Sequence, residues 1–339
     1  MKIKGAARIL PLLLLGVAPC LHATPSLDSS IIGMFPKNVG EITYADLSQA
    51  RKFPWFAQFE QQVLPTRFLE FAQFLKSAGI DPDTQIDGVA WALASKATNQ
   101  GGRDKIIPTT GDWVCVATGR FDPETAQDFL EAHKIRAVEF LNYKMYASIA
   151  GGAGDLFMMF VDSRTLAFGP RSLLERLIRV QGGEEEDLFE NERLLPLINQ
   201  ANGNGIFWSV LDAAGARQTI HQLMPVVAQF AQASLLIHRM GAVMISVQGS
   251  GRMEANIRAV AGSPQDAIVL SQLAQAGLML RQYQVTESNP DMAQILGGVS
   301  IAPSGNQLNI WFTLTEDQLI ALVQHNSFVM KMCDSERIT

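Results

Sequence analysis

Hydrophobic and polar positions between residues 155 and 180 define a compact unit of secondary structure. Residues 156–161 form a short apolar run with the length and composition of a buried strand. The polar residues 162–165 predict a hairpin turn into a second strand at 166–168. Four aliphatic residues then share one face of a predicted helix, and Ser172, just before them, is placed to cap it. The four residues are Leu173, Leu174, Leu177 and Ile178.

The same order of elements occurs twice along the chain. The first series contains strand 40–47, helix 55–76, strands 89–94 and 113–118, helix 124–133, strand 143–149, and the hairpin and helix of 155–180. The second contains strand 205–211, helix 217–239, strands 241–247 and 257–262, a helix beginning at Pro264, and a hairpin and helix over 297–324. Alternation of strands and helices is common, so the case for a repeat rests on the shared order.

These elements predict an α+β fold of two tandem βαββαββα-like modules, with mostly antiparallel sheets and helices packed on one face. The predicted organisation is a signal peptide at 1–23, a first module at 36–181, a linker at 182–204, a second module at 205–325 and a tail at 326–339. The linker contains the acidic run 184–187, whose like charges repel one another and favour a solvated loop. Whether the modules share one continuous sheet stays open.

Two short phrases carry a resemblance to a known group of proteins. Gly79-Ile80-Asp81-Pro82 precedes a strand, and Gly119-Arg120-Phe121-Asp122-Pro123 begins a helix. With a strand near the expected mature N-terminus, these phrases resemble exported bacterial proteins built from tandem α+β modules. The resemblance is strongest over residues 35–180, and its motifs are turn and cap signatures. It implies this fold and export, and it implies no catalytic residue.

The N-terminal residues have the pattern of a secretory signal peptide. Lys2, Lys4 and Arg8 make a basic start, the apolar stretch 9–17 is too short to span a bilayer, and Leu21-His22-Ala23 offers a cleavage site. Cys20 raises the alternative of a lipoprotein, although the proline before it fits a lipid-attachment motif badly. We therefore expect a periplasmic or extracellular protein that begins near Thr24.

Charge and hydropathy narrow the classes of partner. The whole chain has a net charge of −6, and removal of residues 1–23 leaves 24 basic and 33 acidic residues, a net charge of −9. Binding of nucleic acid is favoured by basic patches, so an acidic protein is a poor candidate for a nucleic-acid-binding protein. We expect no transmembrane span in the mature chain, because no later stretch is long and apolar enough.

Cys115 and Cys333 are the cysteines that remain after processing. In an oxidising compartment they have the opportunity to pair. Spacing alone does not establish disulfide geometry, and the preferred interpretation is a buried thiol in a strand and a separate thiol in the tail.

No pattern in the sequence predicts a catalytic, cofactor or metal site. The histidines form no pair at helical spacing, and there is no Cys-x-x-Cys or Gly-x-Ser-x-Gly motif. Gly151 to Gly154 leads into a strand, so the helix N-terminus that binds phosphate in glycine-rich loops is missing. Carboxylates in 81–84 and 122–124 are explained by helix capping.

Aromatic residues are concentrated in one helical segment, which contains Phe53, Trp55, Phe56, Phe59, Phe68, Phe71 and Phe74. A segment interrupted by Pro65 does not easily bury all of them on one stripe, and exposed apolar patches mark binding surfaces. The repeat would bring this segment to the junction of the modules, near the turn 202–205. The candidate binding residues are therefore Trp55, Phe56, Phe59, Asn202 and Asn204.

The sequence favours an exported, non-catalytic protein that binds an envelope protein or a hydrophobic ligand, or forms part of an envelope assembly. Two alternatives stay open. One is a hydrolase or other enzyme with an unrecognised site between the modules, and the other is a carrier of hydrophobic ligands. A pocket with converging polar groups and perturbed carboxylates would indicate an enzyme.

Overall fold

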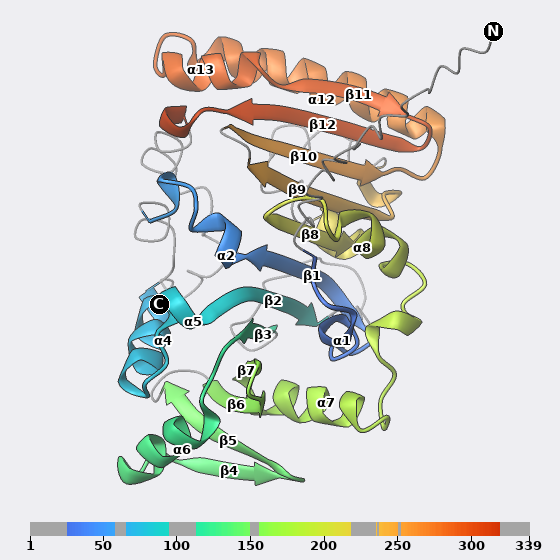
Figure 1. Cartoon of the computed structure of the whole chain (residues 1–339). Coiled ribbons are helices and arrows are strands. Elements are labelled where there is room, and N and C mark those ends of the chain that lie inside the picture. Colours follow the sequence, from blue (N-terminus) through green and yellow to red (C-terminus); the bar gives the residue numbers. More distant parts are fainter. Residues whose placement is uncertain are drawn as a thin grey trace, which may run out of the picture.

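The computed structural model of the protein describes residues 26–57, 66–94, 113–149, 156–217, 235, 237–249 and 252–318. Twelve strands among these residues form one antiparallel sheet (Figure 1). They are β1 (Val39–Asp46), β2 (Ile86–Ala94), β3 (Trp113–Gly119), β4 (Ala137–Phe140), β5 (Tyr143–Ile149), β6 (Leu156–Asp162), β7 (Thr165–Pro170), β8 (Phe207–Asp212), β9 (Ala242–Gly249), β10 (Met253–Val260), β11 (Ser300–Ser304) and β12 (Gln307–Leu314). The order across the sheet is β11-β12-β10-β9-β8-β1-β2-β3-β7-β6-β5-β4.

The pairing of β1 with β8 lies in the middle of this order. It is antiparallel and runs from the pair Glu41–Leu211 to the pair Ala45–Phe207. Moving outward from β1, the next strands are β2, β3, β7 and β6, whereas moving outward from β8 they are β9, β10, β12 and β11. The hairpin β4–β5 extends the sheet beyond β6. Strands from both predicted series therefore lie in one continuous sheet.

Helices cover the sheet, and most of them are short. Those in the described ranges are α1 (Ser29–Ile32), α2 (Leu47–Ala50), α4 (Thr66–Ser77), α5 (Pro82–Gln85), α6 (Pro123–Ala132), α7 (Arg171–Gln181), η1 (Leu188–Glu190, a 3₁₀ helix), α8 (Leu195–Ala201), α12 (Pro264–Val285) and α13 (Pro290–Gly297). Successive strand residues point to opposite faces. Ile42 and Thr43 of β1 therefore define two surfaces, which we call the Ile42 face and the Thr43 face.

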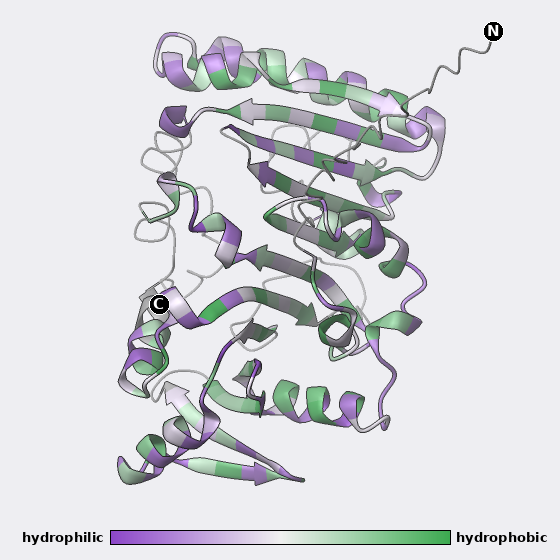
Figure 2. Cartoon of the chain, viewed as in Figure 1, coloured by the Kyte–Doolittle hydropathy of each residue, from purple (hydrophilic) through white to green (hydrophobic). Residues whose placement is uncertain are grey.

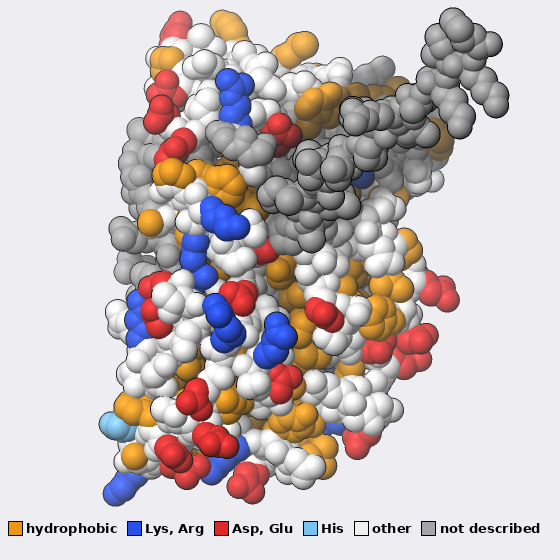
Figure 3. Space-filling model, viewed as in Figure 1, with side chains coloured by type: hydrophobic (Ala, Val, Ile, Leu, Met, Phe, Trp, Pro, Cys, Tyr) orange, Lys and Arg blue, Asp and Glu red, His pale blue; other side chains and the backbone are white. Residues whose placement is uncertain are grey.

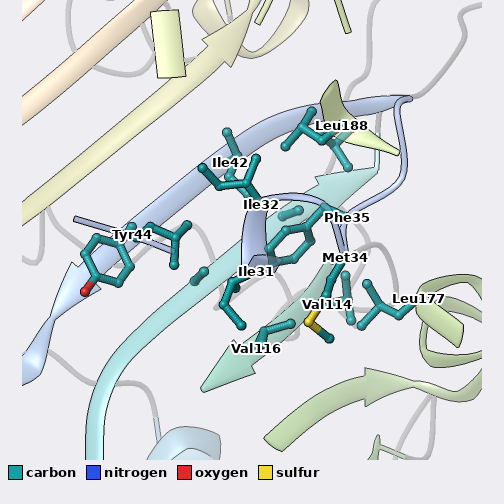
Figure 4. Close-up of a cluster of buried hydrophobic side chains, with 14 of the residues drawn as sticks. Ile31, Ile32, Met34, Phe35, Ile42, Tyr44, Val114, Val116, Leu177 and Leu188 are labelled. Atoms are coloured by element: carbon teal, nitrogen blue, oxygen red, sulfur yellow. The ribbon is translucent and has the colours of Figure 1, made fainter. Parts of the chain in front are cut away.

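The Ile42 face is covered by α1, α7, η1 and α8. Their buried side chains pack with Ile42, Val114 and Val116 of the sheet. Figure 4 shows residues of α1, β1, β3 and α7 gathered around Phe35, whose side chain is fully buried. The helical contributors to this core include Ile31, Ile32, Leu174, Leu177, Leu188 and Ile198.

The Thr43 face carries two further cores. Cys115 and Ala117 of β3 pack with side chains from α4 and α6 on one side of the sheet. Ile245 and Ala259 pack with α12 on the other side. The central pair β1–β8 lies between these two cores.

The α+β class and the antiparallel sheet that the sequence predicts are confirmed. The expectation that helices pack on one face is wrong, because helices cover both the Ile42 face and the Thr43 face. The physical reason is visible in β3, where four successive residues from Val114 to Ala117 are all buried. Such a strand has no polar face to present to water, and its second apolar face requires a cover.

The hairpin and helix that the pattern predicts over 155–180 are confirmed as β6, β7 and α7. The predicted cap is wrong. The N-cap residue is Pro170, which makes no side-chain cap hydrogen bond, and the helix begins at Arg171, before Ser172. The Nε of Arg171 lies 2.6 Å from Oε1 of Glu175, so an ion pair one turn apart is present in the first turns of α7.

In the acidic run, Glu184 and Glu186 are exposed, as expected of a surface loop, whereas Glu185 is partly buried and paired. Glu185 accepts hydrogen bonds from Nε of Arg176 at 3.0 Å and from Nε of Arg179 at 2.8 Å. The residues that follow form η1 and α8, whose Leu188 and Ile198 are fully buried against the Ile42 face. Two arginines thus offset the like-charge repulsion that the sequence suggests.

Figure 2 shows hydrophobic and hydrophilic residues alternating along strands such as β10, and Figure 3 shows acidic and basic side chains interspersed over the visible face.

No helix in the described ranges is long and apolar enough to cross a membrane.

Leu177 tests the packing of α7. Its side chain is fully buried in the core of the Ile42 face, so Leu177→Ala should lower the free energy of unfolding by about 2–5 kcal/mol, through lost transfer energy and a cavity. Leu141→Ala is the matched control, because Leu141 is 64% exposed and its truncation should change stability little. Equal denaturant midpoints for the two variants would show that α7 is not packed in this way.

Candidate functional site

The candidate site lies on the Thr43 face, where β1 and β8 meet. Thr43 and Ser209 are directly opposite each other in this strand pair, and their hydroxyl oxygens are 2.8 Å apart. Thr43 is 1% exposed and Ser209 is 4% exposed. With Glu41 they form a group that we call the seam cluster.

Glu41 brings an ionisable group into this cluster. Its Oε1 lies 3.0 Å from Oγ1 of Thr43 and 3.4 Å from Oγ of Ser209. Burial raises the pKa of Glu41; the hydrogen bonds from the two hydroxyls oppose this shift, and the charge of Asp212 adds to it. Within the described residues, no cation is recorded as acting on this carboxyl group. The net effect favours the neutral acid more than in an ordinary glutamic acid.

Apolar side chains surround the seam cluster. Trp91 of β2 lies opposite Thr43, and Phe207 lies two residues before Ser209 on β8. The two ring centroids are 6.2 Å apart, and both side chains are partly buried. Ala45 is opposite Phe207 on the intervening strand and is itself partly exposed. The aliphatic neighbours on this face are Leu93, Leu211 and Ile245.

The chemistry available here is hydrogen bonding and charge. A serine nucleophile needs an adjacent base held in line by a third group. The recorded hydrogen-bond partners of the Ser209 hydroxyl are Thr43, at 2.8 Å, and Glu41, at 3.4 Å. Across the described ranges, no group of three or more His, Cys, Asp or Glu side chains could hold a metal ion. The arrangement fits recognition of a ligand better than covalent catalysis.

Trp55 and Phe56, which the sequence singles out, form part of an aromatic group after α2. Trp55 stacks with Phe53 at a centroid distance of 5.7 Å and lies 6.2 Å from Phe56. Together with Met253 and Phe312 of the second series of strands, Trp55 packs against a cluster formed by Ile295 and Leu314. All three aromatic side chains are partly buried. Phe59 lies outside the described residues.

Asn202 and Asn204 have structural partners. Oδ1 of Asn202 accepts a hydrogen bond from the backbone N–H of Leu27 at 2.7 Å, and Nδ2 donates to the carbonyl oxygen of Leu27 at 2.9 Å. Nδ2 of Asn204 donates to the carbonyl oxygen of Gln200, near the end of α8. Asn202 thus joins the N-terminal segment to α8 through both functional groups of its amide.

The structure does not bring these two sets of residues together. Asn202 and Asn204 follow α8, which covers the Ile42 face. Trp55 packs against the same cluster as Phe312, whose partner Ala255 is on the Thr43 face. The sheet therefore separates them. The expected meeting of the turn 202–205 with the aromatic segment at the junction is not formed.

The residues of the seam cluster were missed by the analysis of the sequence. Strand 40–47 alternates apolar and polar residues, which is typical of a half-buried strand, so the pattern does not single out Glu41 or Thr43. The available signal was in strand 205–211, where Ser209 interrupts a run that is otherwise apolar on both faces.

Two features elsewhere bear on function. Cys115 is a free, buried thiol whose pKa is raised by burial, and Cys333 lies outside the described residues. The outer surface of α12 is apolar, with five large exposed side chains: Ile268, Val269, Met279, Leu280 and Tyr283.

Glu41→Gln should make stability less sensitive to pH. Because the pKa of Glu41 is raised in the folded protein, neutral Glu41 contributes stability that is complete below the pKa of the unfolded chain. That stability is lost as the pH rises through the higher pKa of the folded state. The advantage of Glu41→Gln over the natural protein in unfolding free energy should therefore grow as the pH rises, as measured by urea unfolding.

The control for this experiment is Glu139→Gln, the same chemical change on the exposed edge strand β4. Its difference from the natural protein should be nearly constant with pH. If Glu41→Gln behaved in the same way, Glu41 would not be perturbed in the folded protein.

Comparisons with known proteins add one likeness of fold. No protein-family model matches the sequence, and neither does any curated protein. A solved structure described as crystal form I of TP0453 is similar with a TM-score of 0.47 and 9% sequence identity, over 88% of this chain and 97% of that chain. A likeness at this level assigns no function.

Proposed function

We propose that the protein is an exported, non-catalytic binding protein that holds an apolar ligand at the seam cluster. The observation that carries the proposal is the position of Glu41, an ionisable side chain at the centre of a large sheet, on a face that helices cover on either side. Glu41 is partly buried, and even partial burial of a carboxyl group costs free energy. Glu41 carries that cost, and among the described residues no cation acts on its carboxyl group. We therefore treat Glu41 as a candidate functional residue.

A purely structural role accounts for the hydroxyl groups better than for the carboxyl group. Thr–Ser pairs across antiparallel strands stabilise sheets, so Thr43 and Ser209 suit a β1–β8 contact without any ligand. Glu41 adds a group that is less stable in this place than an apolar side chain of similar size. Its presence is explained if a ligand interacts with it.

The surroundings of the cluster fit the body of an apolar ligand. Binding sites are mostly apolar, with a few polar groups that fix the orientation of the ligand. Trp91 and Phe207 lie beside Ala45, and their rings, whose centroids are 6.2 Å apart, form a partly exposed apolar surface. The ligand's apolar part would lie against these rings, and its polar end would reach Glu41.

The proposal includes the tandem architecture, with modules at 36–181 and 205–325. The strand order supports it, because β1, β2, β3, β7 and β6 correspond to β8, β9, β10, β12 and β11. Further support comes from α6 and α12, which begin at Pro123 and Pro264 after corresponding strands. On this view, the Thr43–Ser209 contact lies at the axis that relates the modules, and the hairpin β4–β5 belongs to the first module alone.

Export is the second part of the proposal. The basic and apolar pattern of residues 1–23 supports a signal peptide, which would direct the mature protein to the periplasm or outside the cell.

A place in an envelope assembly is the second candidate function. The exposed apolar side chains of α12 favour it, because exposed apolar patches mark interaction surfaces.

Mass spectrometry of the protein isolated from its native envelope tests the export step. The expected N-terminus is Thr24 without a lipid, because cleavage after Ala23 satisfies the small-residue rule for signal peptidase. An acylated Cys20 at the N-terminus would instead establish a lipoprotein. An uncleaved Met1 would contradict export by this signal.

Ala45→Leu tests the ligand site. The larger side chain should cover part of the apolar surface formed by Trp91 and Phe207, and so weaken binding of a neutral apolar dye, N-phenyl-1-naphthylamine, by about tenfold or more. Dye fluorescence on titration with the mature protein measures the affinity. The fold of the variant is checked by its melting temperature.

Ala137→Leu provides the control, since it makes the same substitution at an exposed position of the edge strand β4. It should bind the dye as the natural protein does. No dye binding, or equal binding by all three proteins, would contradict a ligand site at the seam cluster.

A further inference from the structure

Exposed apolar side chains are concentrated on the outer surface of α12. Nine large apolar side chains are exposed in the described ranges, and five of them belong to this helix. Single exposed apolar residues are ordinary, whereas a contiguous group of them marks an interaction surface. We call this group, together with the exposed Ala276 between its members, the α12 stripe. Its residues are Ile268, Val269, Ala276, Met279, Leu280 and Tyr283.

The opposite side of α12 is packed within the protein. Ala267 and Leu270 are buried in one core with Leu308 of β12. Nε2 of Gln275 donates a hydrogen bond to the carbonyl oxygen of Ile301 on β11, at 3.0 Å. The helix therefore lies firmly against the end of the sheet formed by β11 and β12 (Figure 1), and the α12 stripe is the side left for a partner outside this fold.

The α12 stripe has the spacing of a helix that packs lengthwise against another helix. Val269, Ala276 and Tyr283 follow one another at intervals of seven residues, and Met279 lies three residues after Ala276. Residues at alternating steps of three and four form a straight seam along a helix. The remaining position of this seam is Gln272, which is polar but uncharged. Because α12 has 22 residues, it is roughly 33 Å long, enough for an extended contact between helices.

Large and small residues are arranged almost symmetrically along this seam. Ala276 is in the middle, with Val269 seven residues before it and Tyr283 seven residues after it. If two copies of α12 lay antiparallel with their Ala276 residues facing each other, Val269 of each copy would meet Tyr283 of the other. The small central residue would let the helices approach closely, and the larger residues would fill both ends. A two-fold interface requires a surface that is complementary to itself in this way.

The exposed area is sufficient for a dimer. The exposed fractions run from 40% for Val269 to 83% for Tyr283, and the five together equal nearly three whole side chains. At about 200 Å² for a large side chain, this is roughly 600 Å² on each copy. Two copies would then bury on the order of 1,200 Å², which lies at the lower end of the range for specific protein–protein interfaces.

Charge favours a second copy over a membrane surface as the partner. The charged residues of α12 are Asp266 and Arg281, one of each sign, and neither belongs to the seam. Helices that lie on membranes are rich in Lys and Arg, which α12 is not. A second copy would meet no like charge along the seam. The neighbouring sheet edge is a poorer contact, because β11 has five residues and includes Pro303, which has no N–H to donate.

We infer that the protein forms a two-fold symmetric dimer in which two α12 helices pack antiparallel, with the axis at Ala276. The partner that fits the α12 stripe is therefore a second copy of this chain. The inference does not depend on the ligand site at the seam cluster, which lies at the centre of the sheet, whereas α12 lies at its end.

Sedimentation velocity of the mature protein over a range of concentrations tests the dimer. The natural protein should show an equilibrium between monomer and dimer. Leu280→Glu should weaken the association about a hundredfold, since it places an unpaired charge in the interface twice, at about tenfold for each copy. The side chain of Leu280 is 47% exposed, so the variant should fold, as checked by its melting temperature.

Leu141→Glu is the matched control. It makes the same chemical change at a side chain that is 64% exposed, next to β4 at the opposite end of the sheet. Its dimer should be as stable as that of the natural protein.

Ala276→Cys tests the position of the two-fold axis. Two cysteines on the axis would face each other at a distance that a disulfide can span, so mild oxidation should produce a covalent dimer on a non-reducing gel. Ala137→Cys, at an exposed position of β4, is the control for this substitution. It should give no more covalent dimer than the natural protein does.

Several results would overturn the inference. The natural protein could stay monomeric at about 100 μM, a concentration at which even a weak dimer is populated. The dimer could be insensitive to Leu280→Glu, or cross-link no better through position 276 than through position 137. Binding of the monomer to vesicles of phosphatidylethanolamine and phosphatidylglycerol, abolished by Leu280→Glu, would assign the α12 stripe to a membrane instead. Each of these outcomes would leave the dye-binding test of the seam cluster unaffected.

Discussion

The pairing of β1 with β8 is the contact on which the rest of the structure depends. These strands are more than 160 residues apart in sequence, as the contact between Thr43 and Ser209 shows, and they join two groups of strands into one sheet. A long-range pairing of this kind incurs the loop-closure entropy before its contacts form. It is stable because both of its faces are covered: Ile42 and Val210 pack beneath α1 and α8, while Thr43 and Ser209 are buried on the other face. Without this pair each group would present a long unpaired edge.

Burial at the centre determines what the seam cluster can be. A polar residue at the edge of the sheet would be hydrated, whereas the same residue at position 43 or 209 must find a partner in the protein. Thr43 and Ser209 satisfy each other, so the pair is nearly self-sufficient. Glu41 is different, because it takes hydrogen bonds from that pair and brings a charge without returning one. The carboxyl group is thus the member of the cluster that the pairing of the two strands does not itself require.

The local elements could be predicted from the sequence, but which of their residues are buried could not. The hairpin β6–β7 and helix α7 followed from an apolar run, a polar turn and four aliphatic residues at helical spacing. The cover on the second face did not follow, because alternation in β1 looks the same whether the polar side meets water or another layer. The pattern therefore does not single out Glu41. Asn202 looked like a turn residue, and only its contact with Leu27, 175 residues away, shows its role. The Arg176–Glu185 and Arg179–Glu185 pairs likewise depend on how the chain turns after α7.

On the proposed function, stability and ligand binding are coupled through Glu41. In the free protein the partly buried carboxylate raises the free energy of the folded state whenever it is ionised, and burial raises its pKa for the same reason. A ligand that binds the folded state alone and interacts with Glu41 offsets that cost and stabilises the fold by mass action. The added stability would act at the β1–β8 contact, because Thr43 and Ser209 form hydrogen bonds both with each other and with Glu41. The residue that makes the centre of the sheet less stable is therefore the one through which a ligand would hold the two groups of strands together.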